Sequence, residues 1–110
     1  MSLARSTADS RRAPRETVDC PTQIEGMRCP RTDALIVNVS PFGCIIRCNR
    51  IVPIGSILSV NLPSTGQQHG KVMWSLGARL GIEFHAEIPL DDYLAMLPLM
   101  TASPDDMLPN

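Results

Sequence analysis

Lysine and aromatic residues are scarce in this chain of 110 residues. Lys71 is its one lysine, aromatic residues make up 4%, and the formal net charge is −1. Barrels that bind single-stranded nucleic acid usually present several stacking rings, and their affinity grows with the number of phosphates they neutralise. The composition therefore disfavours a nucleic-acid-binding barrel. We keep this function as the least favoured of three hypotheses.

Long apolar runs are also missing. Hydrophobic residues make up 44% of the chain, yet the longest runs, such as residues 35–37 and 43–46, are far too short to span a bilayer. Residues 1–15 contain no apolar core of the kind that a secretory signal needs. The length suits one compact domain. We therefore expect a single cytoplasmic domain without membrane insertion.

The four cysteines are not spaced like the paired C-x-x-C ligands of a zinc site. They are Cys20, Cys29, Cys44 and Cys48. Without a secretory signal, a disulfide framework is disfavoured as well. We predict free thiols that serve as small buried apolar groups, and neither a metal nor a cofactor.

The residue types of an active site are nearly absent. His69 and His85 fall in solvent-facing phases of the predicted strands. No Cys/His or Ser/His/Asp arrangement can be built around either of them. The sequence therefore predicts that this protein is not an enzyme.

Several stretches alternate apolar and polar residues with the period of a half-buried strand. In the clearest of them, Leu80, Ile82 and Phe84 alternate with glycine and charged residues. In another, Val72 and Trp74 are expected on the core side. The predicted strands are 17–25, 34–39, 43–48, 57–62, 67–74 and 78–84. Short connections between six strands predict an all-β fold, a six-stranded antiparallel β-barrel.

One helix is predicted at residues 89–97. Pro89 suits a first helical position, acidic residues follow it, and Pro98 should end the helix. An apolar stripe of Leu90, Tyr93, Leu94 and Leu97 should cover part of the barrel. We therefore expect a flexible arm at residues 1–10, a barrel domain with its helix at 11–98, and a disordered tail at 99–110.

A cluster of arginines precedes the first strand. Arg11, Arg12 and Arg15 stand there with no lysine among them. Guanidinium groups offer planar pairs of donors that fit phosphate oxygens and the O6/N7 edge of guanine. The cluster is a candidate binding site for a small anionic ligand, although arginines on such segments are most often simply solvated.

A second pattern lies at the junction of the second and third predicted strands. Asn38 and Ser40 are two residues apart, so both side chains leave an extended strand on the same face, where they could bind one flat ligand. Gly43 follows and would tolerate a positive φ or a close ligand. The same residue types also make ordinary turns.

In this order, R-x-x-x-R at Arg11 and Arg15, then N-x-S-x-x-G at Asn38, Ser40 and Gly43, the chain resembles the PilZ family. The late stretch 80–84 is similar to that family's Gly-x-x-Phe hairpin. The resemblance implies a six-stranded barrel that binds the bacterial second messenger cyclic di-GMP. It implies arginine contacts to phosphates and guanines, with Arg12 as an auxiliary, Asn38 and Ser40 hydrogen-bonded to a guanine, and close approach at Gly43.

On this interpretation the protein is a signalling adaptor. Nucleotide binding would order the arginine segment and change the surface offered to an unidentified downstream protein. The adaptor would be a monomer or a ligand-dependent dimer. The main alternative is a PilZ-like protein-interaction module that does not bind the nucleotide.

Overall fold

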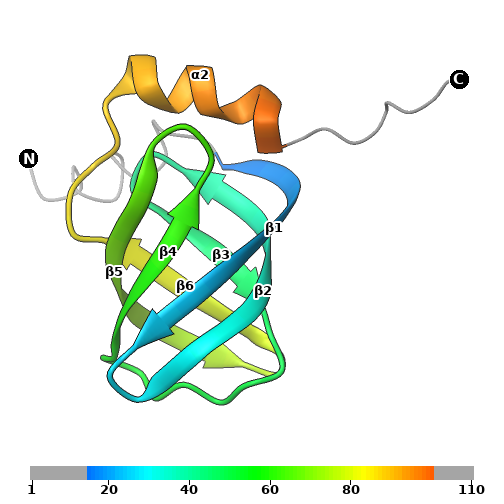
Figure 1. The fold of residues 1–110 in the computed structure, drawn as a ribbon, viewed down its shortest axis with the longest axis vertical. Coiled ribbons are helices and arrows are strands. Elements are labelled where there is room, and N and C mark those ends of the chain that lie inside the picture. Colours follow the sequence, from blue (N-terminus) through cyan, green and yellow to red (C-terminus); the bar gives the residue numbers. More distant parts are fainter. Residues whose placement is uncertain (1–14, 101–110) are drawn as a thin grey trace, which may run out of the picture.

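The fold is a closed barrel of six antiparallel strands with one helix across an end (Figure 1). The computed structural model describes residues 15–100. Around the barrel the strand order is β1-β2-β3-β6-β5-β4. The elements are β1 (Glu16–Gly26), β2 (Cys29–Ser40), β3 (Gly43–Arg47), β4 (Ile57–Leu62), β5 (Gly66–Leu76), β6 (Arg79–Phe84) and α2 (Leu90–Met100). The predicted fold class is confirmed.

Apolar side chains at alternate positions of the strands fill the interior of the barrel. In β4, Leu58, Val60 and Leu62 are buried while the residues between them are more exposed. Other strands contribute buried side chains as well, namely Ile24, Ile36, Ile46 and Leu80. All four cysteines are free thiols within this interior, which agrees with the predicted burial.

The β1–β2 hairpin is longer than predicted. It turns at Met27–Arg28, and β2 begins at Cys29 rather than near Ala34. The register shifts between Ile24 and Gly26, so that Pro30 lies within an irregularity of the ladder. Proline is tolerated at such a bulge because its missing N–H leaves no ladder bond unmade.

The barrel is closed by a short seam. β1 pairs with β4 only from Ile24 to Gly26, opposite Leu58 to Val60. The earlier part of β1 is registered with β2 alone. The N-terminal half of β1 therefore has one strand neighbour, and this half follows directly on Arg15.

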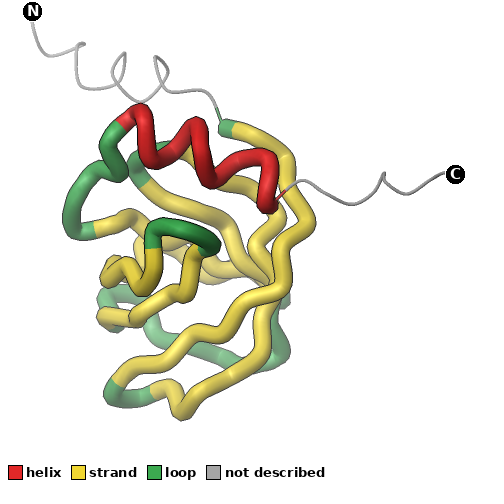
Figure 2. The backbone as a smooth tube through the Cα atoms, turned by 45° about the horizontal axis from the view of Figure 1, so that its top comes forward, coloured by secondary structure: helices red, strands yellow, loops and turns green. Residues whose placement is uncertain are grey.

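The helix α2 lies over one end of the barrel (Figure 2). Tyr93, Met96 and Met100 are buried, and the Tyr93 hydroxyl donates to the Val39 carbonyl oxygen at 3.2 Å. The predicted stripe is therefore wrong in part, because Leu90 and Leu94 are exposed. Two unbranched methionines fill the irregular barrel mouth instead.

The helix also continues past the predicted stop. It ends at Met100, with Pro98 inside its last turn, so two residues assigned to the tail are helical. The proline faces solvent, where water can satisfy the carbonyl group left without a partner, while burial of Met100 holds the last turn in place. The arm at residues 1–10 and the rest of the tail lie outside the described residues.

The helix that the structure describes does not have the length and apolarity needed to cross a membrane. Within residues 15–100, no three His, Cys, Asp or Glu side chains group together as a metal site would require. His69 and His85 are exposed, as their predicted phases require.

Candidate functional site

The candidate residues converge near the start of β1 and the end of β2. Arg15 directly precedes β1, Asn38 and Ser40 are among the last three residues of β2, and Gly43 is the first residue of β3. Arg11 and Arg12 lie outside the described residues. The described part of the candidate site is therefore built from the beginning of one strand and the junction of two others.

A direct contact joins the two sequence motifs. Arg15 donates a hydrogen bond from Nη1 to the Asn38 Oδ1 atom at 3.0 Å, across 23 positions of sequence. The register explains the contact, because Thr17 lies opposite Asn38 in the β1–β2 ladder. Arg15, two residues before Thr17, reaches the same outer face of the sheet.

Asn38 belongs to a row of residues that crosses the outside of the barrel. Register pairs align this row, which we call the outer row: Thr17, Asn38, Ile45, Gly81 and Trp74. The neighbouring row consists of Val39, Cys44, Ile82 and Val72, all of them buried in the core. Since adjacent rows point to opposite faces, the outer row faces solvent.

Trp74 ends the outer row, and its predicted place in the core is wrong. The β5–β6 register shifts between Val72 and Trp74, so that Met73 is an extra residue in β5. Such a bulge moves the following side chain to the other face of the sheet. The indole lies against Gly81, where an added Cβ would overlap the ring, and Trp74 remains 38% exposed.

A hollow of about 250 Å³ lies beside this row. It brings together a guanidinium group, an indole, a carboxylate, two glycines and three other apolar residues. Its lining residues are Arg15, Phe42, Gly43, Met73, Trp74, Gly81, Ile82 and Glu83. A cation and an aromatic face at one shallow surface suit a ligand that carries both negative charge and flat rings.

Ser40 lies closer to the protein interior than the sequence suggested. It is 3% exposed, and its Oγ atom accepts a hydrogen bond from the Phe42 backbone N–H at 3.1 Å. This is the local bond of a serine that shapes a turn. In the described structure, Ser40 therefore holds the β2–β3 turn, while Asn38 stands at the surface.

Gly43 has a structural reason to be glycine. It is not among the residues with positive φ. A Cβ atom at this position would overlap the carbonyl oxygen of Ile82 on the neighbouring β6. The missing side chain thus allows close pairing of β3 with β6, and it also leaves the hollow open.

Two backbone hydrogen bonds, from the end of β6 and from the segment before α2, hold the β2–β3 turn. The Pro41 carbonyl oxygen accepts from the Ile88 N–H at 2.9 Å, and the Phe42 carbonyl oxygen accepts from the Phe84 N–H at 2.8 Å. Both bonds use backbone groups, so they hold the turn whatever side chains it carries. The β2–β3 side of the candidate site is therefore rigid.

Burial determines the ionisation of the groups next to the site. It raises the pKa of the Cys44 thiol to about 12, against a small lowering by Arg15. It also raises the pKa of Tyr93, and the Glu16 carboxylate adds to this while Arg15 opposes it. Cys44 is therefore a neutral thiol at neutral pH and offers no nucleophile.

Sequence reasoning missed Trp74 and Gly81 as candidate site residues. Their only signal was the pair of a tryptophan and a glycine on consecutive strands, and the bulge that turns the indole outward depends on how two strands pair. In comparisons with known proteins, no protein-family model matches the chain, and no curated protein matches it.

Proposed function

We propose that this protein is a PilZ-type receptor for cyclic di-GMP that acts as an adaptor without catalytic activity of its own. The observation that carries the proposal is the bond between Arg15 and Asn38. It joins the arginine motif and the N-x-S-x-x-G motif on one outer face, a few residues from the only tryptophan of the chain.

The polar groups suit the two kinds of polar edge in this ligand. A guanidinium group carries five N–H donors, so Arg15 keeps donors for a phosphate or for the O6/N7 edge of guanine while one Nη1–H bonds Asn38. The Asn38 amide can both donate and accept. This combination recognises a purine next to a phosphate better than a point charge would.

The nonpolar part of the site suits a flat ring. Trp74 presents an indole at one end of the outer row, and between it and Asn38 lie only Gly81 and Ile45. A base can stack on such a ring with an energy of about 1–3 kcal/mol. A glycine beneath the indole also keeps the platform flat.

The hollow holds only part of such a ligand. Its volume of about 250 Å³ lies below the range of about 300–1,000 Å³ typical of small-molecule pockets. A dinucleotide would extend beyond it over the sheet, where it needs further contacts. Arg11 is four residues from Arg15, a distance of at most about 14 Å along the chain, so Arg11 and Arg12 can supply them.

Calorimetric titration of the full chain with cyclic di-GMP tests the proposal. We expect a Kd in the micromolar range or tighter, and a change in Trp74 fluorescence that follows the same isotherm. Arg15→Ala should weaken binding by about tenfold or more, because it removes a charge-assisted bond. Arg79→Ala removes an exposed arginine from the start of β6 and is the matched control.

Two further variants distinguish a residue that contacts the ligand from a residue that supports the fold of the site. Asn38→Ala should lower affinity and leave thermal stability nearly unchanged. Ser40→Ala should lower both, because it removes the bond to Phe42 that shapes the turn. If wild-type protein gives neither heat nor a fluorescence change with cyclic di-GMP up to about 100 μM, the receptor proposal fails and the interaction-module hypothesis replaces it. Equal binding of single-stranded DNA would instead favour the nucleic-acid hypothesis.

A further inference from the structure

The barrel end opposite α2 has a surface that the proposed function does not use. Three connections meet there, at the bottom of Figure 1: the β1–β2 turn at Met27–Arg28, the β3–β4 loop at residues 48–56, and the β5–β6 turn at residues 77–78. No described helix covers this end. We call it the open end.

Apolar side chains project from two of these connections and from the last residue of β5, next to the third. Met27 is 99% exposed and Ile51 90% exposed, and Ile54 and Leu76 are exposed as well. We call these four residues the apolar tips. A single exposed apolar residue is ordinary on a protein surface. Several at the same end of one small barrel mark an interaction surface.

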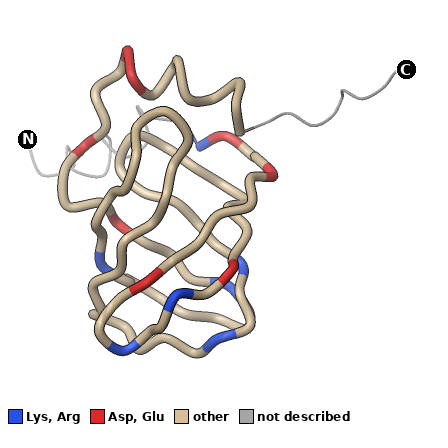
Figure 3. Tube along the Cα trace, viewed as in Figure 1, with Lys and Arg blue, Asp and Glu red and all other residues tan. Residues whose placement is uncertain are grey.

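Positive charge surrounds the apolar tips. The segments 26–32, 47–57 and 70–80 contain Arg28, Arg31, Arg47, Arg50, Lys71 and Arg79, and no Asp or Glu. At the other end, residues 84–100 contain three acidic residues and neither Lys nor Arg. Figure 3 shows most blue positions toward the open end and red positions at the start of α2, although some red positions also lie among the blue ones.

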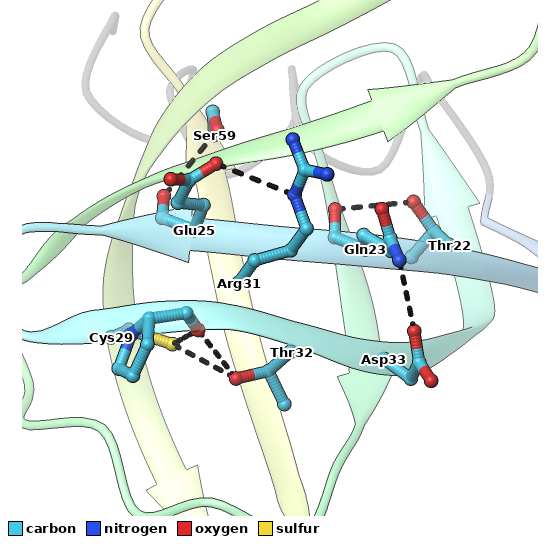
Figure 4. A network of polar contacts seen from close by, with 9 residues as sticks. Thr22, Gln23, Glu25, Cys29, Arg31, Thr32, Asp33 and Ser59 are labelled. Atoms are coloured by element: carbon cyan, nitrogen blue, oxygen red, sulfur yellow. Dashed lines mark hydrogen bonds and ion pairs between the residues drawn. The ribbon is translucent and has the colours of Figure 1, made fainter.

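One of these arginines is partly compensated. Arg31 lies 3.8 Å from a carboxylate oxygen of Glu25, in the network of polar contacts drawn in Figure 4. Arg50 donates from Nε to the Thr32 hydroxyl at 3.1 Å, which leaves its positive charge in place. Arg28 directly follows Met27 in the sequence, and Arg50 directly precedes Ile51.

We propose that the open end docks on an anionic phospholipid bilayer. The apolar tips would enter the boundary between headgroups and acyl chains, and the arginines beside them would meet lipid phosphates. Each Lys or Arg near an anionic membrane surface contributes about 1 kcal/mol. The end with α2, where Glu87, Asp91 and Asp92 outnumber Arg15 among the described residues, would point away from the membrane.

The shape of the open end favours a lipid surface over a helix of a partner protein. A hollow of about 420 Å³ lies between the β1–β2 turn and the β3–β4 loop, lined by Met27, Arg28 and residues 53–57. A helix of three turns is about 16 Å long and about 10 Å across, and it does not fit there. Tips that project from separate turns can instead enter a soft surface together.

Co-sedimentation of the full chain with lipid vesicles tests this inference. Vesicles with about 30% phosphatidylglycerol in phosphatidylcholine should bind the protein, and pure phosphatidylcholine vesicles should bind it at least about fivefold less. Binding should fall as salt rises from about 50 to about 500 mM. Ile54→Asp and Arg28→Glu should each weaken binding by about fivefold or more.

Leu94→Asp is the matched control, because it places the same charge on an exposed apolar position of α2 at the other end. It should bind vesicles nearly like wild type. All four proteins should share one thermal midpoint, since the substituted side chains are at the surface.

Three outcomes would overturn the inference. The first is no binding to anionic vesicles at low salt. The second is an equal loss of binding in Leu94→Asp and Ile54→Asp. The third is self-association or protein binding through Ile54 without any vesicle binding, seen by sedimentation velocity, which would make the open end a protein interface.

Discussion

At one end of the barrel, α2 buries Tyr93, Met96 and Met100, whereas at the opposite end Met27 and Ile51 are almost fully exposed. The two ends use similar apolar residues for different purposes. Where α2 covers the barrel, methionine side chains complete the core. At the open end, equally apolar side chains are largely exposed and remain available for contact with other surfaces. Apolar content therefore says little about stability until the location of each side chain is known.

A matched pair of substitutions gives the largest effect and tests this comparison most directly. Met96→Ala removes a fully buried side chain and should lower the free energy of unfolding by about 2–5 kcal/mol. Met27→Ala removes an exposed one and should change it by less than about 0.5 kcal/mol. Urea titration followed by Trp74 fluorescence measures both. A loss above about 1 kcal/mol in Met27→Ala would mean that the open end is packed, and the comparison would fail.

Two glycines extend the comparison to the backbone. Gly43→Ala should cost about 2–3 kcal/mol, because the new Cβ would overlap the Ile82 carbonyl oxygen. Gly55 lies in the β3–β4 loop at the open end with nothing within 4 Å of a new Cβ, and its φ is +93°. Gly55→Ala should therefore cost only the strain of that φ, about 1 kcal/mol. Urea titration measures both variants, and the reverse order would contradict the close β3–β6 pairing.

Alkaline pH provides the most selective test of the buried interior, because it acts through one thiol. Burial raises the pKa of Cys44 from 9.0 to about 12. Above pH 9 the unfolded chain loses this proton while the folded protein keeps it, so unfolding is favoured as pH rises. Cys44 should reduce stability by about 1.4 kcal/mol per pH unit between these two pKa values. Urea midpoints across this range should fall less steeply in Cys44→Ala, and parallel curves would show that Cys44 is not the source.

Local patterns predicted the barrel well, because most strands depend on one buried face. The limits of β4, Ile57–Leu62, follow from three alternating apolar residues. β2 was predicted too short: it begins at Cys29, and its first residues include Pro30, which lies in the irregular part of the β1–β2 ladder. Trp74 was placed on the wrong face for a similar reason. A bulge is a property of two paired strands, and the sequence of one strand does not contain it.

The candidate site was predicted in its parts but not in its arrangement. Arg15 and Asn38 were both identified as candidates, and their hydrogen bond depends on a register that only the folded sheet defines. Ser40 and Gly43 were read as ligand contacts, whereas the fold itself needs both of them. The open end was missed altogether, because Ile51 and Ile54 look like core residues until three separate connections are brought to the same end.

The short seam between β1 and β4 has a consequence for the mechanics of the barrel. Backbone pairing connects these strands only from Ile24 to Gly26, and the Thr22 hydroxyl adds a bond to the Asn61 carbonyl oxygen, so the barrel resembles a sheet closed along one short edge. Thermal fluctuations that open the cylinder would begin at the unfastened edge of β1, and this edge follows directly on Arg15. The arginine beside the candidate site can thus be repositioned by bending a two-stranded ribbon, at a cost far below that of disrupting the six-stranded core.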